Sequence, residues 1–176
     1  MKGGSIVYQC GDRVVYGVHG VCTILCLENQ IVNKKKCQFF VLEPLAQPGA
    51  RFFVPVNNEV AVSKLRPVLE RAELEAIVES PASFVDAWIP DENQRKNYYK
   101  ELLGSGDRAG LISMVRTLQK QKVIQLEAGK KFHLCDDNFL RDAKKLLGTE
   151  FSLVFSLEGE ALVQYMNDLF DKTNEL

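Results

Sequence analysis

The sequence predicts an α+β fold in which a small β-barrel of Tudor or SH3 size precedes a bundle of helices. Short runs of β-branched and aromatic residues, separated by Gly, Pro and Asn, fill residues 1–68, and such runs are typical of strands joined by tight turns. Apolar residues recur at spacings of three and four through residues 69–176, which is the period of amphipathic helices. The change of pattern near Pro67 therefore predicts two domains, residues 1–68 and residues 69–176.

Turns that contain glycine are expected on either side of the first strand. Gly11 and the following Asp form a turn, and residues 13–16 are rich in the residues that suit a pleated, half-buried surface. A second bend lies between Gly17 and Gly20. The expected strands are residues 13–16, 21–27, 37–42, 51–56 and 60–62, with the polar residues 28–36 as a loop or hairpin tip.

The helical half has clear start and stop signals. A first helix begins at Leu69 and ends at Ser80-Pro81, and another turn or two of helix is expected from Ser83 to Trp88. A third helix is expected to begin at Pro90-Asp91 and to stop at residues 104–106. A fourth begins at its cap Asp107 and carries an apolar stripe to Leu118. Two more helices are expected, from Asp136 to Phe155 and from Glu158 to Phe170.

Composition narrows the class of protein. The chain is 46% hydrophobic and 26% charged, as expected for a globular protein rather than a disordered one. No apolar run approaches the roughly 20 residues that a membrane helix needs, and the start Met-Lys-Gly-Gly lacks an export signal. Five cysteines without regular spacing fit thiols kept reduced in a cytosol. We expect a cytoplasmic protein without a membrane partner.

Charge is unevenly distributed although the whole chain carries −1. Residues 1–68 hold eight Lys or Arg and four Asp or Glu, a net charge of +4. Residues 93–131 hold nine basic and three acidic residues, a net charge of +6, whereas residues 151–176 have a net charge of −4. A local basic surface can bind phosphate even on a nearly neutral chain. Composition thus permits nucleic-acid contact.

Three motifs resemble the CarD family of bacterial transcription regulators. Residues 11–24 read Gly-Asp-Arg-Val-Val-Tyr-Gly-Val-His-Gly-Val-Cys-Thr-Ile, similar to the family signature Gly-Asp-x-Val-Val-Tyr-Pro-x-His-Gly-Val, with Gly17 where the family usually has Pro. The stretch from Tyr99 through Asp107 and on to Leu118 resembles the Tyr-x-x-Leu-x-Ser-Gly-Asp helical hairpin. Residues 129–151 resemble the Gly-x-Lys and Ala-x-x-Leu-Leu-x-x-Glu segment.

The resemblance implies a non-enzymatic transcription regulator without a cofactor. Its first domain would be the Tudor-like RNA polymerase interaction domain shared with the transcription-repair coupling factor, and would bind the polymerase β subunit. Its helical domain would contact promoter DNA near the transcription bubble and modulate open-complex stability. We expect a nucleoid-associated monomer. The alternative is an adaptor that uses the same barrel on another protein without DNA.

The polymerase contact is expected on the strand of residues 51–56. In the family, basic residues on the barrel strands grip the polymerase, but this chain has Phe53 before Val54 instead of Arg. Arg51 lies two residues earlier and so shares a face with Phe53. We expect Arg51 and Phe53 to form a mixed polar and apolar contact. Alternatively, Phe53 fills the core.

Basic residues of the helical domain are the candidates for DNA contact, since few acids interrupt them and the resemblance implies a DNA-contacting surface here. Trp88, the chain's single tryptophan, would correspond to the family's minor-groove wedge, because apolar wedges unstack base steps. Alternatively, Trp88 fills a core and the charges form a solvated helix face. The expected cations are Arg95, Lys96, Lys100, Arg116, Lys120, Lys122, Lys130 and Lys131.

The cysteines and histidines favour structural roles. Cys22 and Cys26 would share a strand face, and with Cys10, Cys37 and His19 a zinc site is conceivable. The short paired spacings that structural zinc prefers are absent from the sequence, whereas buried thiols commonly act as small apolar side chains. We expect no metal, no disulfide and no Cys/His nucleophile.

Overall fold

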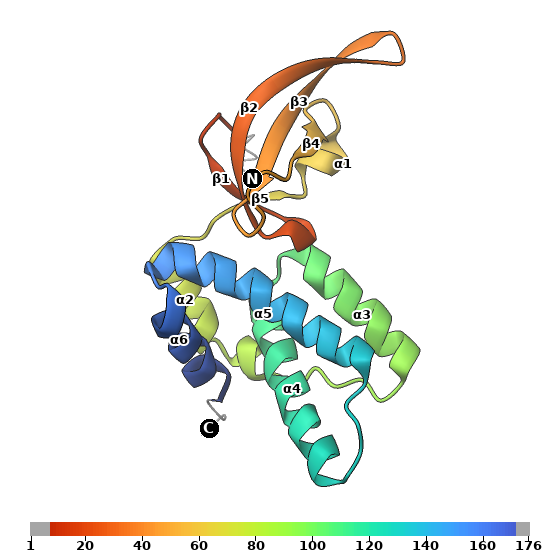
Figure 1. The fold of residues 1–176 in the computed structure, drawn as a ribbon, viewed down its shortest axis with the longest axis vertical. Helices are drawn as coiled ribbons and strands as arrows, with labels where there is room; N and C mark the ends of the chain where they lie inside the picture. The colour runs from red at the N-terminus through yellow and green to blue at the C-terminus, as the bar shows by residue number, and fades with distance from the viewer. Residues whose placement is uncertain (1–7, 172–176) are drawn as a thin grey trace. The chain divides into compact units, whose positions relative to one another are not determined.

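The computed structural model describes residues 8–171, and the chain divides into two compact units, residues 1–68 and residues 69–176 (Figure 1). The first unit contains an antiparallel five-stranded sheet and the second contains helices. The predicted α+β class is confirmed.

The sheet has the strand order β4-β3-β2-β1-β5, and every neighbouring pair is antiparallel. Closure of this sheet into a barrel stays a prediction. The elements of the unit are β1 (Arg13–Tyr16), a 3-10 turn η1 (Gly17–His19), β2 (Val21–Val32), β3 (Lys35–Pro44), β4 (Phe52–Pro55), a short helix α1 (Glu59–Val62) and β5 (Leu65–Pro67).

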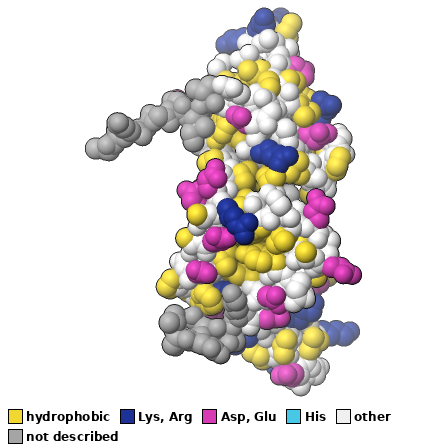
Figure 2. All heavy atoms as spheres, turned by 90° about the vertical axis from the view of Figure 1, so that its left-hand side faces the viewer, with side chains coloured by type: hydrophobic (Ala, Val, Ile, Leu, Met, Phe, Trp, Pro, Cys, Tyr) yellow, Lys and Arg dark blue, Asp and Glu magenta, His cyan; other side chains and the backbone are white. Residues whose placement is uncertain are grey.

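The β2–β3 hairpin is longer than predicted. Residues 28–36 were expected to be a loop, but β2 continues to Val32 and β3 begins at Lys35. Asn33 and Lys34 both have positive φ, at 52° and 64°, which is the backbone of a two-residue type I′ hairpin turn. Basic side chains gather at the exposed tip of this arm (Figure 2). The sequence did not indicate these strands because residues 28–36, the outer arm of the hairpin, are exposed on both faces and show no apolar alternation.

The last strand of the unit was also misplaced. Residues 60–62 were expected to be a strand but belong to α1, whose N-cap Asn58 accepts a hydrogen bond from Ala61 N at 3.0 Å. The fifth strand is β5, which pairs with β1. The helix cap outweighed the β propensity of two valines, because Asn at an N-cap satisfies an otherwise unpaired backbone amide.

One face of the sheet buries the apolar cluster of the unit. A bulge in β2 between Ile24 and Cys26 shifts the register against β3, so the alternation of inward and outward residues changes there. The buried members of the cluster are Val14, Cys22, Ile24, Phe40, Leu42, Val54 and Leu65.

The helical unit begins at α2 (Arg71–Glu79) and continues with the 3-10 turn η2 (Pro81–Phe84), α3 (Glu92–Ser105), α4 (Arg108–Glu127), α5 (Leu134–Phe155) and α6 (Gly159–Asp171). The helix expected over residues 83–88 is wrong. Helical backbone stops at Phe84, and residues 85–90 form an irregular segment. Side chains of neighbouring helices bond the backbone of this segment, which removes the need for helical hydrogen bonds.

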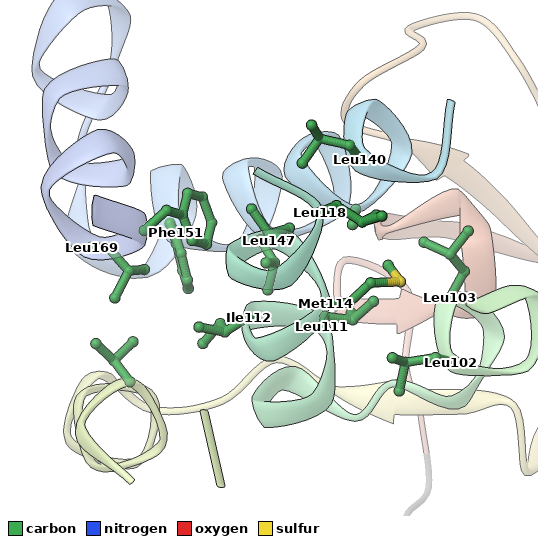
Figure 3. Close-up of a cluster of buried hydrophobic side chains, with 14 of the residues drawn as sticks. Leu102, Leu103, Leu111, Ile112, Met114, Leu118, Leu140, Leu147, Phe151 and Leu169 are labelled. Carbon is green, nitrogen blue, oxygen red and sulfur yellow. The ribbon is translucent and has the colours of Figure 1, made fainter. Parts of the chain in front are cut away.

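The core of the helical unit lies between α4 and its neighbours. Figure 3 shows Leu111, Ile112 and Met114 pointing from α4 among side chains of the other helices. Leu147 and Phe151 enter the same cluster from α5 and are 1% and 0% exposed. Apolar burial of this kind is the main stabilising term for a helical bundle.

The Ser-Gly-Asp motif has a structural explanation at the α3–α4 turn. Gly106 has φ 73°, the left-handed C-cap that glycine adopts readily. Asp107 caps α4 by accepting a hydrogen bond from Gly110 N at 3.0 Å. Three residues after the motif, a Cβ on Gly110 would lie 2.7 Å from Leu102 Cδ1, so glycine at this position allows α3 and α4 to approach closely.

Two buried Arg–carboxylate pairs attach α5 to the two preceding helices. Arg108 at the start of α4 donates to Glu150 through Nε at 3.1 Å and Nη2 at 2.8 Å. Arg95 of α3 donates to Asp136 through Nε at 3.0 Å and Nη2 at 2.9 Å. Such two-pronged contacts are directional as well as strong. They therefore define where α5 lies against α3 and α4.

Candidate functional site

Strand β4 forms one edge of the sheet, and its successive side chains point to opposite faces. Val54 is buried, and the Phe52 ring packs with its centroid 3.9 Å from that of His19. Phe53 points to the opposite face and is 44% exposed. Arg51 precedes the strand and is exposed. Of the two sequence alternatives for Phe53, the structure therefore favours the surface position.

Phe53 is exposed on the outer face of the hairpin, next to Val41, which is fully buried on the same face. Strand register pairs Phe53 with Val41 and Val41 with Cys26, which places these three residues on one face. The rings of Phe39 and Phe53 meet edge to face, with centroids 6.4 Å apart. Sequence reasoning missed Phe39. Its signal was the apolar residues on both faces of β3, which exceed what a one-sided sheet needs.

Arg95 does not lie on the surface. It is 3% exposed, and its fork with Asp136 satisfies two of its nitrogens. The third nitrogen, Nη1, donates to the carbonyl oxygens of Ile89 at 2.7 Å and Pro90 at 3.3 Å. Its charge is therefore balanced by Asp136 inside the helical unit, and Arg95 is not part of the surface that contacts a partner.

Arg116 is also committed to contacts inside the helical unit. Its Nη1 donates to the Ser83 carbonyl at 2.7 Å and its Nη2 to the Leu169 carbonyl at 2.7 Å. The guanidinium lies over the Phe84 ring, 3.8 Å from the centroid. Burial lowers the pKa of Arg116. It joins η2 to α6, which gives it a structural role.

The remaining candidate cations are more accessible. Lys96 pairs with Glu92 one turn earlier on α3, and Lys122 pairs with Asp137 at 2.6 Å, with both side chains about two-fifths exposed. Exposed pairs of this type are weak and can exchange partners. Four further lysines are exposed, and none of them makes a salt bridge within residues 8–171: Lys100, Lys120, Lys130 and Lys131.

Trp88 is half-buried rather than enclosed. It packs against the edge of the helical core, and the Arg95 guanidinium lies over its ring, 4.2 Å from the centroid. Its backbone amide donates to Asp86 Oδ1 at 2.9 Å. The ring thus has a supported side and an accessible side, which is compatible with a contact residue.

A groove of about 500 Å³ lies beside the same segment. Phe84 and Val85 form part of its wall, and Lys120 and Val123 of α4 form another part. Volumes of this size are common for binding sites. Lys120 therefore lies next to apolar surface, but Asp86 and Asp171 line the same groove.

Acidic residues are concentrated on helix α6 of the helical unit. Helix α6 has no Lys or Arg, whereas its sequence includes Glu160, Asp168 and Asp171. An anionic partner would avoid this helix and favour the lysines of α3, α4 and the loop before α5.

The cysteines do not assemble into a site. All five thiols are free, and Cys22 is buried, where burial raises its thiol pKa to about 11. Within residues 8–171, no three His, Cys, Asp or Glu side chains lie together in an arrangement able to hold a metal ion. Over the same range, no helix is long and apolar enough to cross a bilayer.

Residues 8–68 match the family model described as the CarD-like/TRCF RID domain, in which RID denotes the RNA polymerase interaction domain. The matched range covers the whole five-stranded sheet. The curated proteins contain no match to the chain. The family evidence therefore concerns the sheet unit.

Proposed function

Because residues 8–68 form a CarD-like RNA polymerase interaction domain, we propose that this protein is a non-enzymatic, cytoplasmic and nucleoid-associated transcription regulator. Its sheet unit binds the polymerase β subunit, and its helical unit contacts promoter DNA next to the transcription bubble. The family match of the sheet unit is the observation that carries this proposal. The DNA half rests on the accessible lysines and on Trp88.

The polymerase surface is the edge strand β4 with the outer face of the hairpin. Phe53 and Phe39 supply apolar contact area there, and Arg51 supplies a charge at the rim. Aromatic residues and Arg are enriched at protein interfaces. An edge strand also offers backbone groups to a partner. We therefore retain Arg51 and Phe53 as the polymerase-binding residues.

Replacing Arg51 by glutamate is expected to raise the Kd for the isolated β subunit roughly tenfold or more, because charge complementarity is reversed at the rim of the contact. Lys64→Glu is the matched control, since Lys64 is exposed, lies in the same unit and changes the net charge equally. Surface-immobilised β subunit with full-length variants gives the measurement. Equal weakening by both variants would exclude a local contact at Arg51.

The DNA contact is weak and depends on the polymerase tether. Six lysines remain in the DNA set: the exposed Lys100, Lys120, Lys130 and Lys131, and the partly exposed, salt-bridged Lys96 and Lys122. A few phosphate contacts give only non-specific affinity. Binding to polymerase converts DNA contact into an intramolecular event with a high effective concentration. The protein then shifts the equilibrium between closed and open complexes by its difference in affinity for the two.

Replacing Lys130 and Lys131 together by alanine is expected to weaken DNA contact equally on all sequences. The slope of log affinity against log salt should fall by about 0.9 for each phosphate that the variant no longer neutralises. Titration of polymerase–promoter complexes at several salt concentrations measures this slope. Arg141→Ala is the control, because its side chain is 70% exposed on α5 and lies outside the proposed surface.

The second candidate function is an adaptor that binds polymerase without DNA. The observation that favours it is the burial of Arg95 and the internal contacts of Arg116, which remove two of the eight expected cations from the DNA set. Salt dependence separates the two functions. An unchanged slope in the variant lacking both loop lysines, with intact polymerase binding, supports the adaptor.

A further inference from the structure

The irregular segment of residues 85–90 carries Trp88, and its backbone is bonded to side chains of α3 and α4. Polar backbone groups that are removed from water need such partners. The bonds run from Ser113 Oγ to the Val85 carbonyl, from Ala87 N to Thr117 Oγ1 at 2.9 Å, and from the Tyr99 hydroxyl to the Ala87 carbonyl at 3.0 Å.

Arg95 completes this attachment and also reaches the Trp88 ring. Its Nη1 donates to the carbonyls of Ile89 and Pro90, the two residues that follow the tryptophan. Its planar face supports the indole at 4.2 Å. The other edge of the guanidinium is held by Asp136 of α5. One buried side chain therefore contacts both the ring and the backbone beside it.

We propose that Arg95 is a positioning residue that holds the Trp88 indole in place for contact with DNA, while Asp136 orients Arg95. That Trp88 contacts DNA is part of the proposed function, and the inference rests on it. A ring ordered in advance avoids the loss of side-chain and loop freedom that binding otherwise requires. Supporting groups of this kind are what make a contact residue effective.

Lysine cannot replace arginine in this role. The guanidinium acts as a planar fork and a stacking surface at the same time, whereas an ammonium is a compact charge on a flexible stem. Arg95→Lys keeps the positive charge beside Asp136 but removes the fork and the flat support. The substitution therefore tests positioning rather than charge.

The chain has a single tryptophan, so intrinsic fluorescence reports Trp88 alone. For Arg95→Lys in the full chain without DNA, we expect emission at longer wavelength and a roughly twofold rise in acrylamide quenching, because the cation–π contact and its desolvated support are removed. Arg108→Lys is the matched control. It alters the other buried Arg–carboxylate pair, with Glu150, and leaves Trp88 fluorescence unchanged.

Arg95→Met combined with Asp136→Leu is the second variant, because it removes the pair without leaving a buried unpaired charge. It is expected to release the ring as Arg95→Lys does, with helix content checked by circular dichroism. Wild-type quenching in both Arg95 variants overturns the inference, and so does equal release of the ring by Arg108→Lys. Release of the ring in the Arg95 variants alone, with the lifetime of open complexes unchanged by Trp88→Ala, supports positioning and contradicts the proposed DNA contact.

Discussion

Replacing Asp136 by alanine is expected to lower the free energy of unfolding by about 3–5 kcal/mol, because it leaves a buried guanidinium without its counter-charge. Asp136 is 1% exposed and accepts both prongs of the Arg95 fork. Urea denaturation of the full chain, followed by helix circular dichroism, measures the loss.

Asp137→Ala is the control for this variant. The neighbouring carboxylate pairs with Lys122 at 2.6 Å, but its side chain is 42% exposed. An exposed pair of this kind contributes about 1 kcal/mol or less. If the two alanine variants lose similar amounts of stability, the Arg95–Asp136 pair is not the buried connection described above.

Replacing Phe151 by alanine is expected to destabilise the helical unit by about 3–5 kcal/mol, the usual result of removing a buried aromatic ring. Phe151 is 0% exposed, and its ring packs against those of Phe155 and Tyr165 at centroid distances of 5.8 Å and 5.7 Å. Thermal melting followed at helical wavelengths measures the effect.

Binding to the β subunit gives a second readout for Phe151→Ala. The sheet unit has its own apolar cluster and its own contact residues, so we expect polymerase binding to persist at temperatures where the helical unit has melted. Leu134→Ala is the control, because Leu134 is 76% exposed and surface substitutions usually change stability by less than about 0.5 kcal/mol. Joint loss of helices and polymerase binding would contradict the assignment of that binding to the sheet unit.

The sequence predicted most elements where local chemistry and packing agree. Asp107 was expected to cap a helix, and it accepts from Gly110 N. The predictions failed where a local interaction outweighed composition, as at the helix capped by Asn58. They also failed in the outer hairpin, where residues on both faces are mostly exposed and the sequence shows no apolar alternation.

The candidate site was less predictable, because a side chain's partners are distant in sequence. Arg95 and Lys96 are adjacent in a basic helix, yet one is buried against Asp136 and the other is partly exposed. No spacing rule connects residue 95 with residue 136. Arg116 likewise finds its carbonyl partners in η2 and α6. Helical periodicity does distinguish the two sides of a helix, but it cannot say which charge is neutralised.

The two Arg–carboxylate forks have a consequence for motion. Asp136 and Glu150 are separated by 14 residues on α5, about 21 Å along the axis and nearly four full turns, so they lie on one side of the helix. Each of them fixes α5 to a neighbouring helix, Asp136 to α3 and Glu150 to α4. A slide by a single turn would break both connections at once, so α5 is poorly suited to ratcheting past its neighbours. Any signal that passes through the helical unit should therefore move α3, α4 and α5 together as a rigid block.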